Sequence, residues 1–215
     1  MAPALFNSTN QINDIVVGNG YIIVAGGGGI LRRVTDDATP TSTSTTFGIF
    51  GSTNIRALCH NGSVCIAVGE SGKCAYSTDT PNATWNDSIA ALQAAVASNN
   101  MLSAAWGSSK FCVVGVGGYI ATSPDGATWT QRASGASIFG SATILKIRWV
   151  GSKFVAMTKT NIWGESTDGI TWTANSSPVQ LTTNSGHIPM DACLTATNSK
   201  IAVGCSNGDV YTTSP

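Results

Sequence analysis

Two short stretches of the chain place polar side chains in the same order. "SPDGATWT" begins at Ser123 and "STDGITWT" begins at Ser166, so that Asp125 and Asp168 lie 43 residues apart in matching surroundings. Such polar groups look catalytic, because carboxylates perform general acid–base chemistry when they converge on one site. An aspartate before a glycine can instead accept N–H bonds within its own turn. Whether the stretch is part of a structural repeat decides between these interpretations.

The remaining chemistry-bearing residues do not form a recognisable enzyme motif. The two histidines, His60 and His187, fall in different predicted loops, and the chain has no HExxH motif or Cys/His cluster for zinc. It also has no Gly-x-Ser-x-Gly nucleophile elbow. The run "AGGGGILRR" lacks the Lys-Ser/Thr of a phosphate loop, which favours a tight turn. We therefore expect a non-enzymatic protein with no cofactor and no metal.

The six cysteines have no CxxC spacing, and most lie in apolar runs such as "SVCIAVG". This pattern favours small buried thiols in a reducing compartment over a disulfide framework, although their even number allows disulfides. They are Cys59, Cys65, Cys74, Cys112, Cys193 and Cys205.

Composition excludes several classes of partner. Charged residues are 10% of the 215, and eleven basic side chains balance eleven acidic ones. Without a basic stripe we expect no nucleic acid, and without a long apolar run we expect no membrane insertion. The N-terminus "MAPALFNSTNQ" has neither a basic nor an apolar segment, so no signal peptide is predicted.

The elements that position these residues repeat along the chain. Similar apolar runs begin at Tyr21, Ser63, Lys110, Lys153 and Lys200, which are 42, 47, 43 and 47 residues apart. Each run is preceded by one strand-like segment and followed by a turn, another strand and the Asp-Gly stretch. Four-stranded units at this spacing are typical of a β-propeller, in which Asp-Gly forms the hairpin between the third and fourth strands. The fourth strand is then expected to begin at the Thr-Trp pair that follows each Asp-Gly turn. One further segment, Asp87 to Asn100, is predicted to be a short helix capped by Asp87 or Ser88.

The sequence therefore predicts an all-β fold: a single domain forming a five-bladed β-propeller of four-stranded antiparallel blades. The expected blades span about 12–51, 55–89, 101–134, 144–177 and 190–215, the last together with 1–11. The last repeat stops before its fourth strand, whereas "FNSTNQI" from Phe6 matches "FGSTNIR" from Phe50 at the end of the first blade. We thus expect the N-terminal strand to complete the last blade and so protect its edges.

The repeated motif resembles the Asp-box of the BNR, or sialidase-type, repeat. The matching positions predict structural turns and inward-facing tryptophans, with a looser copy in "STDTPNATW". Sialidases of this type use an arginine cluster, but no arginine here lies in an Arg-Ile-Pro context, so an inherited sialidase site is not expected. The Asp-box residues are Ser77, Asp79, Thr84, Trp85, Ser123, Asp125, Gly126, Thr128, Trp129, Ser166, Asp168, Gly169, Thr171 and Trp172.

The chain also resembles small bacteriophage-encoded propellers with "SPDGxTW" repeats. This resemblance implies a structural or interaction protein of the virion, such as a decoration, tail or fibre protein, assembled in the host cytoplasm and bound to other virion proteins. The alternative is a lectin-like propeller that binds a surface glycan, and a photosystem-assembly-like propeller is a third resemblance. The variable loops of one face are the expected contact region, with candidate partner-binding residues Glu70, Lys159, Asn161, His187 and Asn207.

Overall fold

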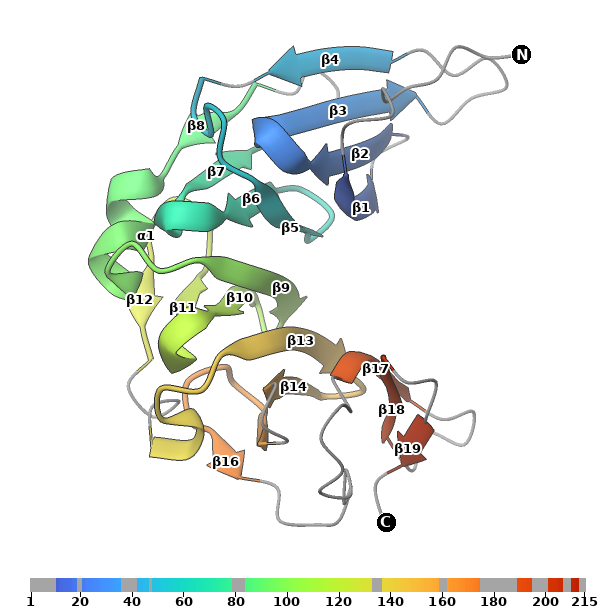
Figure 1. Ribbon diagram of the computed structural model, residues 1–215, viewed down its shortest axis with the longest axis vertical. Helices are drawn as coiled ribbons and strands as arrows, with labels where there is room; N and C mark the ends of the chain where they lie inside the picture. The colour runs from blue at the N-terminus through green and yellow to red at the C-terminus, as the bar shows by residue number, and fades with distance from the viewer. Residues whose placement is uncertain are drawn as a thin grey trace. The chain divides into compact units, whose positions relative to one another are not determined.

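The fold is built almost entirely from antiparallel sheets whose strands follow one another in the sequence (Figure 1). A computed structural model describes residues 11–18, 21–35, 42–46, 48–78, 84–132, 137–158, 162–174, 189–194, 201–206 and 210–212. Within these residues four sheets have four strands each, and a fifth has three.

The strands of each sheet are as follows. The first sheet contains β1 (Ile12–Gly18), β2 (Tyr21–Gly26), β3 (Ile30–Thr35) and β4 (Ser42–Thr46); the second contains β5 (Ile55–His60), β6 (Cys65–Gly69), β7 (Cys74–Ser77) and β8 (Asn86–Asp87). The third contains β9 (Met101–Gly107), β10 (Lys110–Gly115), β11 (Ile120–Ser123) and β12 (Thr130–Gln131); the fourth contains β13 (Ile144–Val150), β14 (Lys153–Thr158), β15 (Trp163–Ser166) and β16 (Thr173–Ala174). The fifth contains β17 (Pro189–Leu194), β18 (Ile201–Cys205) and β19 (Val210–Thr212).

The strand order confirms the antiparallel repeat that the sequence predicts, with one correction. The fourth strands were expected to begin at Thr-Trp, but β12 begins at Thr130 and β16 at Thr173, one residue after each tryptophan. The reason is that the turn hydrogen bonds continue as far as Thr128 and Thr171. The tryptophan therefore closes the turn instead of opening the strand.

The predicted helix is present as α1 (Ile89–Val96). Ser88 occupies its N-cap position but its side chain makes no capping bond. Asp87 instead accepts the N–H of Ile89 at 2.7 Å, so it supplies the acceptor that the first turn of a helix needs. The run "GGGG" forms a tight turn, as expected, and similar 3₁₀ turns connect the second and third strands of three sheets: η1 (Gly27–Gly29), η2 (Glu70–Gly72) and η3 (Val116–Gly118).

The chain separates into two compact units. The first comprises residues 1–101 with 125–128, and the second comprises residues 102–124 with 129–215. The core of the first unit is centred on Phe50, Ile55 and Leu58, and that of the second on Phe139, Ile147 and Phe154. Buried cysteine side chains contribute to both units, as predicted for Cys59, Cys65, Cys74, Cys112 and Cys205; the Cys193 side chain lies outside the described part.

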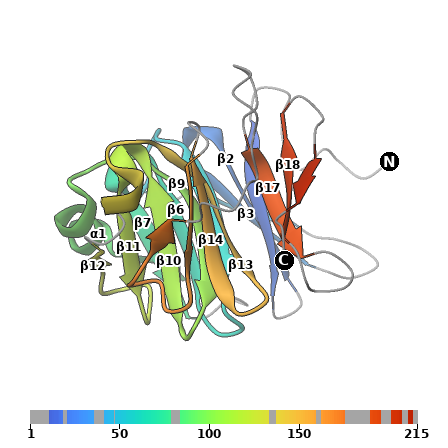
Figure 2. The same cartoon turned by 90° about the horizontal axis from the view of Figure 1, so that it is seen from below.

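Neighbouring sheets within each unit are joined in the same way. In the first unit, Asp14 of β1 accepts the N–H of Leu58 in β5 at 2.8 Å. In the second unit, Ser103 of β9 accepts the N–H of Ile147 in β13 at 3.2 Å, and these sheets lie face to face (Figure 2). Because Leu58 and Ile147 each lie three residues after the start of their strands, the joint is a structural repeat.

Candidate functional site

The two tight Asp-box turns hold their carboxylates within the turn itself. Asp125 accepts the N–H groups of Ala127 and Thr128, both at 2.9 Å. Asp168 accepts those of Ile170 at 2.7 Å and Thr171 at 2.8 Å. The hydrogen bonds expected from the motif are therefore present, and each carboxylate serves the backbone of its own hairpin.

The tryptophans of the motif point inward to different extents. Trp172 is buried, donates its ring N–H to the carbonyl of Gly169 at 3.3 Å and packs edge-to-face on Phe139. Trp85 is buried in the core of the first unit, whereas Trp129 is half-buried. The serines that precede the turns, Ser77, Ser123 and Ser166, are buried; Asp79 lies outside the described residues.

The hydrogen bonds of Asp168 also affect its acidity. Burial alone would raise the pKa of its carboxyl group, but the N–H groups of Thr171 and Ile170, the hydroxyl of Ser166 and the charge of Lys110 together hold the pKa below its usual value. A lowered pKa means that the ionised form is bound more favourably in the folded chain. Asp168 thus contributes stability above the ordinary pKa of aspartate, and this contribution is lost as the pH falls through the folded pKa.

We expect Asp168→Ala to lower the free energy of unfolding by about 1–3 kcal/mol, because two turn N–H groups lose their acceptor. Asp168→Asn keeps an acceptor oxygen and should lose less. Urea unfolding at several pH values measures both effects, and the part of the acid sensitivity due to this carboxylate should disappear in both variants. A ligand affinity lost at unchanged stability would instead make the Asp-box a binding site.

Glu70 is the one predicted partner-binding residue in the described part, and its carboxylate forms hydrogen bonds with side chains of the same chain. Its carboxylate accepts the side-chain amide of Asn54 at 2.9 Å and the guanidinium of Arg56 at 2.5 Å. The hydrogen bond from Asn54, the bonds and charge of Arg56 and the Asn54 backbone N–H lower its pKa despite partial burial. Glu70 therefore fixes η2 against the start of β5. A contact with a partner stays a prediction for Glu70, and Lys159, Asn161, His187 and Asn207 lie outside the described residues.

A second polar arrangement involves the middle residue of each 3₁₀ turn. The N–H of Gly28 in η1 donates to the Asn54 side-chain oxygen at 3.0 Å, and the N–H of Ser71 in η2 donates to that of Asn100 at 2.8 Å. Each asparagine immediately precedes the first strand of the following sheet. In η3 the middle residue is Gly117, and the residue before β13 is Thr143. Within the described part of the chain, the Gly117 N–H has no such acceptor.

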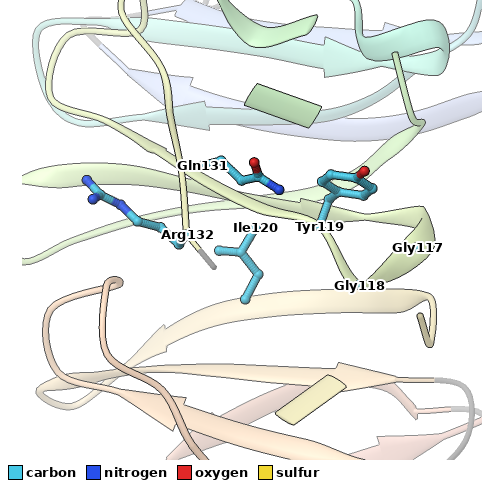
Figure 3. A pocket seen from close by; sticks show the side chains of 6 residues that line it. All are labelled: Gly117, Gly118, Tyr119, Ile120, Gln131 and Arg132. Carbon is cyan, nitrogen blue, oxygen red and sulfur yellow. The ribbon is translucent and has the colours of Figure 1, made fainter. Parts of the chain in front are cut away.

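A pocket of about 180 Å³ lies next to this open turn. It is lined by Gly117, Gly118, Tyr119, Ile120, Gln131 and Arg132 (Figure 3). The Gln131 amide and the Tyr119 ring face each other, whereas the Arg132 side chain extends away from Tyr119. Arg132 is held there by a hydrogen bond from Nε to the Thr122 hydroxyl at 2.7 Å. The pocket thus has an aromatic ring and an amide in its lining, and it adjoins a turn whose middle N–H has no acceptor among the described residues.

Sequence analysis did not identify this pocket. The repeat nevertheless contained the signal. The residue immediately before the first strand of a sheet is Asn54 in the second sheet, Asn100 in the third and Thr143 in the fourth. Asparagine carries its oxygen one bond further from Cβ than threonine does. A comparison of the units at this one position would have marked η3 as the turn that lacks its acceptor.

The other charged side chains do not converge on a reactive centre in the described ranges. Arg148 pairs with Asp191, and Lys153 pairs with Glu165. His60 was predicted to lie in a loop, but it is the last residue of β5. Burial lowers the pKa of its imidazole. The described residues contain no group of His, Cys, Asp or Glu suited to a metal ion, and among them no helix has the length and apolar character needed to cross a membrane.

Comparison with known proteins defines the class of the fold. No family model and no curated protein matches the chain in sequence. Among solved structures, YCF48 bound to D1 peptide has a TM-score of 0.65 at 16% identity, over 99% of this chain and 71% of that one. YCF48 from Cyanidioschyzon merolae has a TM-score of 0.59 at 14% identity, over 95% and 82% of the two chains. The WD40 β-propeller domain of Doa1 has a TM-score of 0.64 at 8% identity, over 97% and 66%. The chain has a β-propeller fold.

Proposed function

We propose that this chain is a non-enzymatic propeller that binds a partner protein and that it is a component of a bacteriophage particle. Its sheets form the five blades of one closed ring, and the N-terminal segment supplies the outer strand of the last blade. The Asp-boxes act as structural turns that keep one face of the ring regular. The partner is recognised on the other face, where the 3₁₀ turns lie.

The observation that carries the binding role is the set of three 3₁₀ turns. Two of them are closed by asparagines from the next repeat, and the third leaves a backbone donor beside a pocket. A rigid scaffold with one open polar turn is suited to recognition. A structural neighbour that is described as bound to a peptide supports a protein as the partner. The resemblance of the Asp-Gly repeats to small phage propellers supports the virion as its location.

The engaged state of the charged side chains supports a role without catalysis. Glu70, Asp125 and Asp168 each accept hydrogen bonds from nearby backbone or side-chain groups. Carboxylates used in this way are committed to fixing turns, whereas a general acid or base must reach a substrate proton.

The test is whether the protein co-purifies with phage particles. Particles of the phage that encodes the chain would be purified on a density gradient, washed in high salt and probed with an antibody against this protein. We expect co-fractionation that survives the wash, together with no signal on a glycan array. Recovery only in the soluble fraction would refute the virion role, and strong array binding would favour the glycan-binding alternative.

A further inference from the structure

We propose that the pocket beside Gly117 binds the side-chain oxygen of an asparagine or aspartate presented by a partner protein. This inference rests on the proposed function insofar as it requires a protein partner, but it does not require that the partner be a virion protein. It adds the chemical group that is recognised and the atoms that recognise it.

The chain itself shows which group fits this kind of turn. In η1 and η2 a carboxamide oxygen, from Asn54 and Asn100 respectively, accepts the N–H of the middle residue at 3.0 and 2.8 Å. In all three turns the middle residue has a positive φ: 66° at Gly28, 59° at Ser71 and 75° at Gly117. The third turn therefore presents its N–H in the same backbone conformation as the two turns that are occupied.

The contacts around η3 place it equivalently in its unit. A Cβ on Gly29 would meet the carbonyl oxygen of Gly51 at 2.2 Å, and a Cβ on Gly118 would meet that of Gly140 at 2.1 Å. The segments that approach the turns also match in sequence, "FGSTN" from Phe50 and "FGSAT" from Phe139. Thr143 thus stands where Asn54 stands in the first unit. Its hydroxyl oxygen is attached directly to Cβ, and no hydrogen bond joins it to Gly117 within the described residues.

The size and walls of the pocket favour a side chain as the occupant. About 180 Å³ is smaller than the roughly 300–1,000 Å³ of pockets that enclose small-molecule ligands, but it accommodates a side-chain carboxamide. The exposed Gln131 and the half-buried Tyr119 border it on the side shown in Figure 3. Gln131 can donate or accept a hydrogen bond, so it can pair with either the NH₂ or the second oxygen of the incoming group.

The charge near the pocket distinguishes the two candidate groups, the carboxamide of asparagine and the carboxylate of aspartate. The Arg132 guanidinium belongs to a lining residue, but it points away from Tyr119 and donates to Thr122. It therefore stands at the periphery, where it favours a carboxylate through its charge without being needed for a carboxamide. Both groups offer an oxygen acceptor, which the Gly117 N–H does not have within the described part of the chain.

The experiment uses the full chain labelled with ¹⁵N and follows the Gly117 amide signal during titration. The probes are the N-acetyl methylamides of asparagine and aspartate, with the leucine derivative as an apolar control. We expect a saturable downfield shift of the Gly117 proton with at least one of the two polar probes and none with leucine. The Gly28 amide, which is already bonded to Asn54, serves as the internal reference and should not respond.

The matched variant is Thr143→Asn, which recreates in the third turn the residue that closes the first two. We expect it to shift the Gly117 amide signal without any probe. We also expect it to weaken probe binding by about fivefold, the value of one net hydrogen bond. Gln131→Ala, an exposed change that leaves the fold intact, should weaken probe binding while the Gly117 amide stays where it is in the unliganded protein.

The inference is overturned if the Gly117 amide signal does not shift with either polar probe. It is also overturned if the signal shifts as much in Thr143→Asn as in the unchanged protein. A stronger response to aspartate than to asparagine supports it and identifies the carboxylate as the preferred group; the reverse order supports it and identifies the carboxamide. A clear response in a protein that does not co-purify with particles leaves the pocket standing and refutes only the virion role.

Discussion

Gly29→Ala is expected to lower the free energy of unfolding by about 3 kcal/mol, whereas Gly28→Ala in the same turn should cost only about 1–2 kcal/mol. Both glycines have positive φ, 71° and 66°, so both substitutions carry the strain of a left-handed alanine. Only at Gly29 would the new Cβ also meet the Gly51 carbonyl oxygen at 2.2 Å; at Gly28 it would meet nothing within 4 Å. Equilibrium unfolding in urea measures the difference.

This pair of variants tests the close approach of the turn to the preceding connection. Because Gly29 allows that approach, it also sets the distance at which Asn54 can accept the Gly28 N–H. Gly118→Ala should behave like Gly29→Ala in the second unit, since its φ is 72° and its Cβ would meet the Gly140 carbonyl oxygen at 2.1 Å. Equal costs for Gly28→Ala and Gly29→Ala would show that strain alone matters and that the approach is looser than described.

The strands were predictable because they depend on local pattern and repetition. The second strand of a sheet is an apolar run: β6 is buried throughout, and β10 is buried from Phe111 onward. The same order of strands recurs along the chain. The Asp125 and Asp168 bonds were predictable for the same reason, since donor and acceptor lie two or three residues apart. Such contacts are properties of one hairpin.

The environment of Glu70 could not be predicted in this way. Its partners Asn54 and Arg56 lie 16 and 14 residues earlier, and they reach it because Ile55 pairs with Gly69 in the register of β5 and β6. A sequence shows that Glu70 lies in a loop of variable composition, but only the register shows that its carboxylate is already engaged. The missing acceptor at Gly117 likewise depends on a residue of the next repeat. In the described part of the chain, Thr143 stands where the first two repeats have Asn54 and Asn100, so no single motif shows it.

Deletion of Met1–Asn10 is expected to have the largest effect of all, because the proposed ring closure depends on that segment. The apolar face of β1 indicates where closure is needed. Ile12, Ile15 and Val17 are 45%, 51% and 62% exposed. The residues equivalent to Ile15, three positions after the start of their strands, are Leu58, Ala104 and Ile147, with exposures of 3%, 5% and 0%. This position is therefore buried in the second, third and fourth repeats, whereas in the first repeat it is exposed.

The fifth sheet has the complementary feature. In its described part it has three strands where the others have four, and Val210 of β19 is 69% exposed. The match between "FNSTNQI" and "FGSTNIR" aligns Phe6 with Phe50 in the sequence. Phe50 is completely buried. In the proposed closed ring, a fourth strand from the N-terminal segment would pair with β19 and bury Phe6. The same closure would cover Ile12, Ile15 and Val17 of β1.

We therefore expect the chain without Met1–Asn10 to lose about 3 kcal/mol or more, the cost of removing a large buried aromatic side chain, and to aggregate through its exposed strand edge. Thermal unfolding and light scattering measure the two effects. Deletion of Met1–Leu5 is the matched control, because it keeps the segment from Phe6 and should change neither. Adding a synthetic peptide of residues 1–12 should restore the lost stability to the shortened chain. An unchanged melting temperature and a monomeric state after the longer deletion would show that the N-terminal segment does not close the ring.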